Sequence, residues 1–531
     1  MQYVWKISGE QGEGIDSSGH IFAFNAFKNG FKIATYRKYS SRIKGGNTTF
    51  EVIFSNKPVF TRLKKVDVLV ALDQDSVEVS KEQIKPDTFI IFDEEVNLKS
   101  IDKIDSIKLS IPLAKIAREV TGVAISKNMV AIGASLAIFE NMDYSYIFEQ
   151  IERRFSKKSQ ELVDKNKRAF LEGYKIARDL IISNGYKFKS VTKVNVNSEK
   201  MMLMSGNEAL SMGALAAGCK YFAGYPITPA SSILENMVRN IENFGGVAVQ
   251  TEDEISAINS VIGAALAGVR AMTATSGPGL SLMVEGIGYA YATETPIVIA
   301  NIQRGGPSTG LPTKTEDGDI LMTLFMGHGD TEKIVIFPSD PYEMFILGFE
   351  AFNLAEKYQL PVIILSDLNL GENAYTTKYI SDEVLEKLKI DRGKFINSED
   401  NISTNKILRY QDTEDGISPR IMIGTKGLQF QTSGNEHDEN GFITENRNIR
   451  KKMVEKRMRK LSNFNEYYLS FEDFGNNPEI CIISYGITYH SVKEVVEKIN
   501  LDKGYGFRII KPVVFYPFPI EKIEELVKDS K

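Results

Sequence analysis

The chain has 531 residues, 43% hydrophobic and 25% charged, which is enough for about three or four globular domains with ordinary cores. Its 64 basic and 69 acidic side chains are mixed along the sequence, so a nucleic-acid-binding surface is not expected. The two cysteines, Cys219 and Cys481, lie far apart and outside any CxxC spacing. This excludes a disulfide framework and an iron–sulfur cluster ligated by this chain alone.

No membrane span or targeting segment is expected. The apolar run at 296–302 is much shorter than the roughly 18 residues of a membrane span. The N-terminal sequence MQYVWKISGE has neither the basic start nor the apolar core of a signal peptide. With so few cysteines, the sequence predicts a protein of the reducing cytoplasm.

Residues 1–185 predict one α/β domain. Its strand-like runs are, in order, YVWKIS, KIATYRKY, TFEVIF, VDVLVAL, TFIIFD and SIKLSIP. Helical runs such as NMVAIGASLAIFE are interspersed, and long charged helices between 144 and 184 close the segment. The next stretch, 186–204, has little core pattern and is predicted to be a linker.

The loop GEQGEG after the first strand has two interpretations. Gly9, Gly12 and Gly14 would let backbone N–H groups approach a phosphate at the following helix. However, Glu10 and Glu13 would repel that phosphate, and the spacing departs from the dinucleotide fingerprint. A purely structural turn therefore explains the loop equally well.

Residues 205–375 predict a doubly wound parallel sheet. The strands YFAG, VAVQT, RAMTAT, PIVIANI, KIVIFP and PVIILS are separated by helical runs long enough for crossovers. In such sheets ligands bind at the carboxyl ends of the strands. A weakly patterned region, 376–470, follows. Strand ICIISYG, helix HSVKEVVEKI and strand FRIIKPVVFYPF then predict a last α/β domain at 471–531.

The loop YPITP directly follows the strand YFAG. Its two prolines restrict the backbone and exclude both a helix and a central strand. Thr228 is predicted to be the N-cap, and Pro229 the first residue, of a helix through ILENMVRNI. A hydroxyl at the positive end of a helix can hold an anion, although an ordinary strand–loop–helix junction has the same pattern.

Three acids, Glu252, Asp253 and Glu254, precede a helix rich in small residues, ISAINSVIGAALAG. Acids in a first turn usually stabilise the helix dipole, which accounts for Glu252 and Asp253. Glu254 leads into the apolar run, where a buried carboxylate needs a partner or a chemical task. The residues alone do not choose among the three.

Arg304 follows a buried strand and enters a loop of glycines, prolines and hydroxyls, GGPSTGLPTKTEDGD. Its guanidinium can bind a planar carboxylate with two N–H groups, and a surface ion pair is the alternative. TSGPG at 275–279 is another tight loop at a strand end. The basic run at 450–460 predicts a solvated helix face, with docking of an acidic electron carrier as the alternative.

Four motifs in this order, GYPITP, TEDEISAINSVIGAALAG, TSGPGLSLMVEG and QRGGPSTGLPT, resemble the 2-oxoacid:ferredoxin oxidoreductases. The resemblance is to the α subunit with a fused γ domain. RIKGGNTTFEV and NMVAIGA within 1–185 look like the γ domain, and 205–375 looks like the domain that holds the aminopyrimidine of thiamine diphosphate. Residues 471–531 look like a transketolase C-terminal-type domain. The resemblance thus implies a multi-domain α/β fold.

The resemblance implies that a 2-oxoacid is oxidised in the presence of coenzyme A to an acyl-CoA and CO₂, and that the electrons pass to ferredoxin. The favoured substrate is 2-oxoglutarate. A carboxylate on N1′ of the aminopyrimidine favours the tautomer that removes the C2 proton. Glu254, nine positions before Gly263, matches that carboxylate. Thr228 and Arg304 match residues that hold the carboxylate and carbonyl of the 2-oxoacid, and Thr313 matches a position linked to substrate choice. Four residues are expected beside the cofactor: Tyr225, Pro226, Ile227 and Ser276.

The chain departs from the family pattern where a second subunit is expected to contribute. It lacks the cluster cysteines and the GDG…N motif for Mg²⁺ and diphosphate, which the family keeps on a β subunit with a 4Fe–4S cluster. We therefore expect that this chain has no metal site and is inactive by itself. We also expect that it shares the cofactor site with the β subunit, in a dimer of heterodimers. The family adds a strand after the final helix, so a truncated tail is one interpretation.

Two other functions fit part of the pattern. One is a related thiamine-dependent oxidoreductase for pyruvate or aryl pyruvates, because the motifs report the cofactor better than the substrate side chain. The other is a non-catalytic assembly subunit. A scaffold has no reason to keep Thr, Glu and Arg at the strand ends of one sheet, which favours catalysis.

Overall fold

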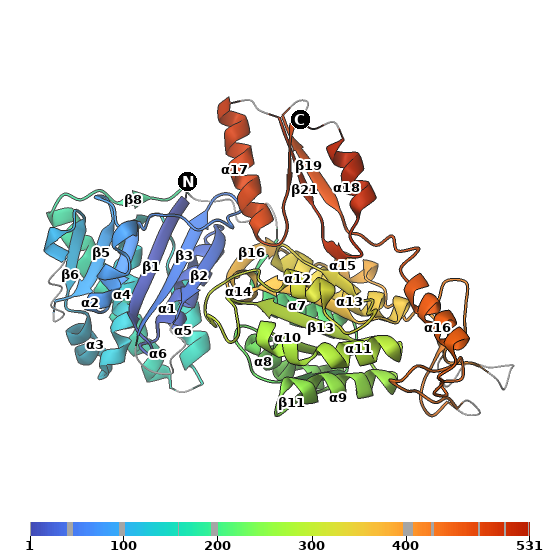
Figure 1. Ribbon diagram of the computed structural model, residues 1–531. Coiled ribbons are helices and arrows are strands. Elements are labelled where there is room, and N and C mark those ends of the chain that lie inside the picture. Colours follow the sequence, from blue (N-terminus) through green and yellow to red (C-terminus); the bar gives the residue numbers. More distant parts are fainter. Residues whose placement is uncertain are drawn as a thin grey trace. The chain divides into compact units, whose positions relative to one another are not determined.

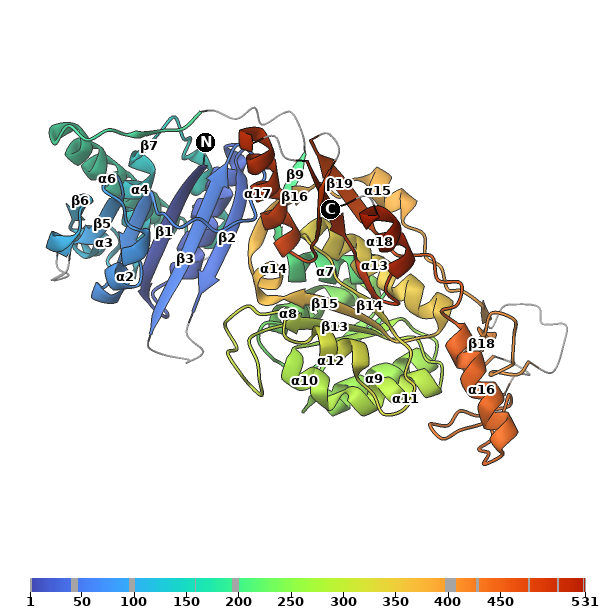
Figure 2. The same ribbon diagram turned by 45° about the horizontal axis from the view of Figure 1, so that its top comes forward.

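The computed structural model divides into two compact units, Met1–Met204 with Asn373–Tyr379, and Ser205–Glu372 with Ile380–Lys531 (Figures 1 and 2). The structure describes the following residues: 2–39, 46–94, 101–157, 159–192, 200–396, 407–425, 429–475, 478–503, 506–528 and 530.

The first unit is built on an eight-stranded mixed sheet, in the order β6-β5-β4-β1-β3-β2-β16-β9. All six strands predicted for residues 1–185 form, and β1 pairs parallel with β4 and antiparallel with β3. Its strands are β1 (Gln2–Glu10), β2 (Lys32–Lys38), β3 (Asn47–Ser55), β4 (Val68–Ala71), β5 (Phe89–Asp93), β6 (Ile107–Ile111), β7 (Phe139–Glu140), β8 (Lys189–Ser190), β9 (Met201–Ser205) and β16 (Ala374–Lys378). Its helices are α1 (Ile15–Lys28), α2 (Gln74–Glu78), α3 (Leu113–Thr121), α4 (Lys127–Ala137), α5 (Ser145–Phe155) and α6 (Gln160–Ser183).

Strand β16 reaches the first unit from a distant part of the chain. Thr376 Oγ1 accepts a hydrogen bond from the N–H of Ile33 at 2.8 Å, and the N–H of Ala374 donates to Thr35 Oγ1 at 2.8 Å. This return of the chain was not expected from the sequence. The stretch 186–204, predicted as a linker, contains β8 and most of β9.

The glycine loop between β1 and α1 is held by contacts within the unit. Gly12 and Gly14 have φ of 99° and 79°, a left-handed conformation that favours glycine. The Glu13 carboxylate pairs with Lys127 Nζ at 2.8 Å, and the Glu13 carbonyl accepts a hydrogen bond from Asn128 Nδ2. These contacts account for the loop as a structural turn.

The second unit contains the predicted doubly wound sheet, in the order β11-β10-β12-β13-β15-β14-β22. The first six strands are parallel, and β22 pairs antiparallel with β14. Helices α7 and α13 pack on one face, and α9 and α11 on the other (Figure 1). The strands are β10 (Tyr221–Gly224), β11 (Val247–Gln250), β12 (Ala271–Thr275), β13 (Val298–Gln303), β14 (Ile334–Ile336), β15 (Val362–Asp367) and β22 (Val514–Tyr516). The helices are α7 (Gly206–Ala216), α8 (Ser231–Asn240), α9 (Glu254–Leu266), α10 (Gly277–Leu282), α11 (Val284–Ala292), α12 (Ile320–Phe325), α13 (Pro341–Tyr358) and α14 (Leu368–Glu372).

The remainder of the second unit follows β16 in the chain. A small sheet has the order β19-β21-β20, and the chain passes from β21 to β22 in the larger sheet, so the predicted last domain shares a strand with the doubly wound sheet. The elements are α15 (Asp382–Lys387), β17 (Phe395–Ile396), β18 (Arg420–Ile421), α16 (Arg447–Arg459), β19 (Ser470–Phe474), β20 (Ile480–Ile483), α17 (Thr488–Lys503), β21 (Phe507–Lys511) and α18 (Ile520–Val527).

The prediction of a solvated face for the basic run 450–460 is wrong for three of its cations. Lys456 and Lys460 are completely buried and share the Glu294 carboxylate. Arg457 is also buried and pairs with Glu436 at 3.0 Å. Burial is tolerated because each cation meets a carboxylate from elsewhere in the unit.

Within the described residues, no helix is both long enough and apolar enough to span a lipid bilayer.

Candidate active site

The YPITP loop leaves β10 at the carboxyl edge of the large sheet, but its threonine does not cap a helix. Helix α8 begins at Ser231, and Ala230 occupies its N-cap position. The carbonyl of Ile227 accepts hydrogen bonds from the N–H groups of Ala230 at 2.8 Å and Ser231 at 3.0 Å. These bonds close a turn before the helix starts, so the predicted N-cap role of Thr228 and helical position of Pro229 are wrong.

Arg304 lies just after β13 and contacts the YPITP loop. Its Nη1 donates to the Thr228 carbonyl at 2.7 Å, and its Nη2 donates to the Thr309 carbonyl at 3.0 Å. The side chain is buried, Nε has no hydrogen-bond partner among the described residues, and no carboxylate there forms an ion pair with it. Arg304 is therefore not the surface ion pair that the sequence left open. Burial lowers the pKa of Arg304, and the nearby Asp319 opposes this shift.

The three consecutive acids at the start of α9 have three different environments. Glu252 is exposed, and Asp253 caps the helix by accepting a hydrogen bond from the Ser256 N–H at 2.7 Å. Glu254 is only 6% exposed, and its carboxylate has no hydrogen-bond or ion-pair partner in the described part of the chain. It lies against Gly279, where an added Cβ would stand 2.6 Å from Glu254 Oε1. The structure thus singles out Glu254 as the buried, unpaired acid.

The other predicted residues follow β10, β12 and β13 at this edge. Ser276 is fully buried, and its hydroxyl lacks a partner among the residues described. Tyr225 and Pro226 are exposed, and Ile227 is half-buried. Thr313 is half-buried in the loop that follows Arg304. The Gly305 N–H donates a hydrogen bond to the Lys314 carbonyl at 2.9 Å, which brings the two ends of this loop together. Among the described residues, no polar contact joins Thr313 to Arg304 or Thr228.

Sequence reasoning missed two amides that organise this edge. Asn301 Nδ2 donates to Asp319 Oδ2 at 3.0 Å, and Gln303 Oε1 accepts from the Asp319 N–H at 2.9 Å. Both amides lie in the fully buried strand β13, and polar residues inside such a strand are the signal that could have found them. Burial, followed by the carboxylates of Asp367 and Asp319, raises the pKa of the neighbouring Asp317 to about 7.

A curated relative of known family aligns with nearly the whole chain. The 2-oxoacid:ferredoxin oxidoreductase subunit alpha of a Sulfolobus species is 34% identical over 587 residues, which cover 99% of this chain and 89% of the relative. This chain belongs to the 2-oxoacid:ferredoxin oxidoreductase α-subunit family. Two family models also match the chain. The model of pyruvate ferredoxin/flavodoxin oxidoreductase matches residues 4–176, and the thiamine diphosphate-binding model of pyruvate flavodoxin/ferredoxin oxidoreductase matches residues 212–456.

Two further members of this group of oxidoreductases are similar to the chain. The solved 2-oxoglutarate:ferredoxin oxidoreductase from Magnetococcus marinus, with 2-oxoglutarate, coenzyme A and succinyl-CoA bound, has a TM-score of 0.90 and 32% identity, over 100% of this chain and 91% of that one. The 2-oxoglutarate synthase subunit KorA of Methanocaldococcus jannaschii is 38% identical over 62% of this chain and 86% of its own length. The multi-domain α/β fold predicted from the sequence is confirmed.

The residues at the carboxyl edge suit the aminopyrimidine end of thiamine diphosphate. The Glu254 side chain is buried, and its carboxylate has no partner among the described residues. The Ser276 hydroxyl is buried and also lacks a partner there, and an unsatisfied buried polar group is costly without a ligand. The absence of a side chain at Gly279 lets Glu254 and Thr275 pack directly against the backbone there. No group of three or more His, Cys, Asp or Glu side chains that could hold a metal ion occurs in the described ranges.

Proposed function

We propose that this oxidoreductase α subunit acts on 2-oxoglutarate, in an oxidative decarboxylation with coenzyme A that yields an acyl-CoA and CO₂ and passes electrons to ferredoxin. The observation that carries the proposal is the contact between Arg304 and the Thr228 carbonyl at the sheet edge where Glu254 is buried without a partner. The names of the Magnetococcus and Methanocaldococcus relatives support 2-oxoglutarate over other 2-oxoacids.

Arg304 and Thr228 are proposed to hold the substrate. A guanidinium has five N–H donors, and the carbonyls of Thr228 and Thr309 engage one donor each on Nη1 and Nη2. The Nε–H and the remaining hydrogens are thus left for the carboxylate of the 2-oxoacid, which a guanidinium binds bidentately. The Thr228 hydroxyl is proposed to donate to the ketone oxygen, and Thr313 to face the substrate side chain.

Glu254 is proposed to hold the proton at N1′ of the aminopyrimidine, with Ser276 and Tyr225 to Ile227 around the ring. When bound, thiamine diphosphate supplies the nucleophilic carbon and the electron sink for decarboxylation. The Glu254 side chain is only 6% exposed, and partial removal from water strengthens the interaction of a carboxylate with a protonated ring nitrogen. The diphosphate, Mg²⁺ and a 4Fe–4S cluster are proposed to reside on a β subunit.

The test of substrate choice uses the chain reconstituted with its β subunit. We expect kcat/KM with 2-oxoglutarate to exceed that with pyruvate, measured as reduction of ferredoxin in the presence of coenzyme A. A clear preference for pyruvate or an aryl pyruvate would assign the related oxidoreductase instead. Full assembly without any 2-oxoacid-dependent reduction would support the non-catalytic assembly subunit.

A further inference from the structure

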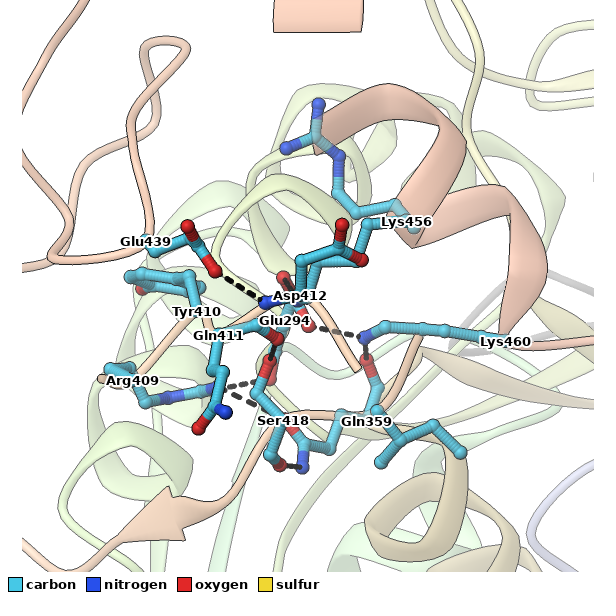
Figure 3. Close-up of polar contacts among 12 residues, drawn as sticks. Glu294, Gln359, Arg409, Tyr410, Gln411, Asp412, Ser418, Glu439, Lys456 and Lys460 are labelled. Carbon is cyan, nitrogen blue, oxygen red and sulfur yellow. Dashed lines mark hydrogen bonds and ion pairs between the residues drawn. The ribbon is translucent and has the colours of Figure 1, made fainter. Parts of the chain in front are cut away.

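A group of buried charges lies at the amino ends of the large sheet's strands, opposite the Arg304 edge. Glu294, which precedes β13, is completely buried together with Lys456 and Lys460. Its carboxylate contacts Lys456 Nζ at 2.5 Å and Lys460 Nζ at 2.8 Å (Figure 3). One carboxylate therefore serves two ammonium groups.

A second buried carboxylate in the same region has three arginine partners. Glu356 on α13 contacts Arg270 Nε at 2.8 Å and Arg392 Nη2 at 2.6 Å, and it also pairs with Arg420 Nη2. Arg270 and Arg420 are buried. The positive charge in this second group exceeds the negative charge. Glu294 and Glu356 each already contact at least two basic side chains, so neither carboxylate is available to a further cation.

Arg409 is a further cation between the two groups, and it has no carboxylate of its own. Its side chain is only 2% exposed. Its guanidinium donates to Gln359 Oε1 at 3.0 Å and to the Glu294 backbone carbonyl at 2.7 Å (Figure 3). No carboxylate of the described residues forms an ion pair with it. Charged side chains are almost never fully buried without a counter-charge.

Arg409 and Arg420 line the same small cavity of about 10 Å³. Arg420 is buried, and its Nε–H has no acceptor among the residues that the structure describes. The cavity has room for about one particle of the size of a water molecule. Its other lining residues are Ala265, Leu266, Thr295, Pro296, Ile421 and Phe430.

We propose that this cavity binds one small monovalent anion, chloride, between Arg409 and Arg420. An anion would accept a hydrogen bond from the unpaired Nε–H of Arg420 and would supply the counter-charge that Arg409 lacks. A neutral water molecule would satisfy only the hydrogen bond. A volume of about 10 Å³ favours a monatomic anion over a phosphate, a sulfate or an organic carboxylate. The anion would join the segment after Ile380, which contributes both arginines, to Ala265 on α9 and Thr295 before β13.

Crystals of the full-length chain soaked in bromide test the site directly. We expect an anomalous peak within hydrogen-bonding distance of both Arg409 and Arg420. The proposal would be overturned if the cavity held only water or if no bromide lay beside these arginines. It would also be overturned if equal peaks appeared at exposed arginines, because such peaks would mark an adventitious ion only.

Thermal unfolding provides a solution test. The sodium salt of gluconate, a bulky organic anion, is replaced by sodium chloride at constant ionic strength. We expect the melting temperature of the wild-type chain to rise by about 1–3 °C and to saturate, because a ligand that binds only the native state stabilises it. Arg420→Lys keeps the positive charge but loses the Nε–H, so this chloride-dependent rise should disappear.

Arg392→Lys is the matched control. Arg392 contacts the same Glu356 carboxylate but does not line the cavity, so its variant should keep the chloride-dependent rise. A wild-type melting temperature that does not respond to chloride, or a response that survives in Arg420→Lys, would refute the assignment. If Arg420→Lys does not fold, the bromide experiment on the wild-type chain decides alone.

Discussion

At the scale of single residues, position within a first helical turn decides what each carboxylate at 252–254 can do. Asp253 uses its side chain to cap α9, and Glu252 remains exposed. Glu254 is turned into the unit and lies against Gly279. Three chemically similar neighbours therefore have a structural, a solvent-facing and a proposed catalytic position.

Glu254→Gln should nearly abolish turnover and leave folding and subunit assembly intact. The amide has almost the volume of the carboxylate, but it cannot stabilise a protonated ring nitrogen. The expected loss is at least the roughly 10²- to 10⁴-fold typical of removing an acid–base group. The measurements are ferredoxin reduction and hydrogen–deuterium exchange at C2 of thiamine diphosphate in the complex with the β subunit.

Glu252→Gln and Asp253→Asn are the matched controls for that loss. Both should have small effects, because Glu252 is exposed and asparagine is as good an N-cap as aspartate. Wild-type C2 exchange in Glu254→Gln would show that the carboxylate is wrongly assigned. An equal loss of C2 exchange and turnover in Glu252→Gln would assign the role to Glu252.

Arg304→Lys should raise the KM for the 2-oxoacid by about tenfold or more and leave the KM for coenzyme A unchanged. Lysine keeps the charge but loses the planar fork, and a charged hydrogen bond is worth about 1.5–3 kcal/mol. Arg239→Lys is the control, because Arg239 forms an exposed pair with Glu235 on α8. An unchanged KM in Arg304→Lys would remove Arg304 from the substrate site.

At the scale of elements, α16 shows that the composition of a helix does not decide its exposure. The helix is highly basic, yet Lys456 and the C-cap Lys460 turn inward to Glu294 (Figure 3). Removing one partner of a buried charge pair leaves the other unpaired, at a cost of about 3–5 kcal/mol. The Glu294 group therefore anchors α16 to the sheet.

Stability should rise with pH between about 7 and 10.5 because of Lys460. Burial lowers the pKa of Lys460 to about 7 from an ordinary value of 10.5. In that window the unfolded chain binds a proton that the native chain has released, so the free energy of unfolding increases with pH. Urea unfolding of the full-length chain at several pH values measures the slope.

Lys460→Met should flatten this part of the stability profile, because the variant has no proton to release there. Lys451→Met is the control on the same helix, since Lys451 is exposed. An identical slope in the wild-type chain and in Lys460→Met would contradict the role of Lys460.

At the scale of the whole molecule, the family relationship covers the full chain, while the proposed cofactor site needs a second subunit. The described residues include Glu254, which we propose to act on the aminopyrimidine, and no group of three or more side chains that could hold a metal ion. The chain has only two cysteines, too few to ligate a 4Fe–4S cluster by itself. We propose that a β subunit supplies the ligands of the metal and of the cluster.

The isolated chain should neither bind thiamine diphosphate with Mg²⁺ stoichiometrically nor oxidise a 2-oxoacid. Isothermal titration and ferredoxin reduction measure the two properties, and addition of a brown, cysteine-containing β subunit should restore both. Stoichiometric binding and turnover by the chain alone would refute the shared site.

The sequence by itself determined the six strands of residues 1–185 and the six parallel strands of the large sheet, because apolar periodicity and proline or glycine punctuation are local properties. The motif order also determined the family and pointed to Glu254 and Arg304. Only the tertiary structure decided that Thr228 offers a carbonyl to Arg304 and does not cap α8. It also decided which acid of 252–254 is buried.

Contacts between distant residues account for the remaining differences. Strand β16 joins β2 across more than 300 residues, and Lys456 meets Glu294 across 162. The cavity between Arg409 and Arg420 likewise depends on α9 and on the residues before β13. No local pattern encodes such contacts, because a basic or polar side chain is solvated or buried according to the partner that the fold brings to it.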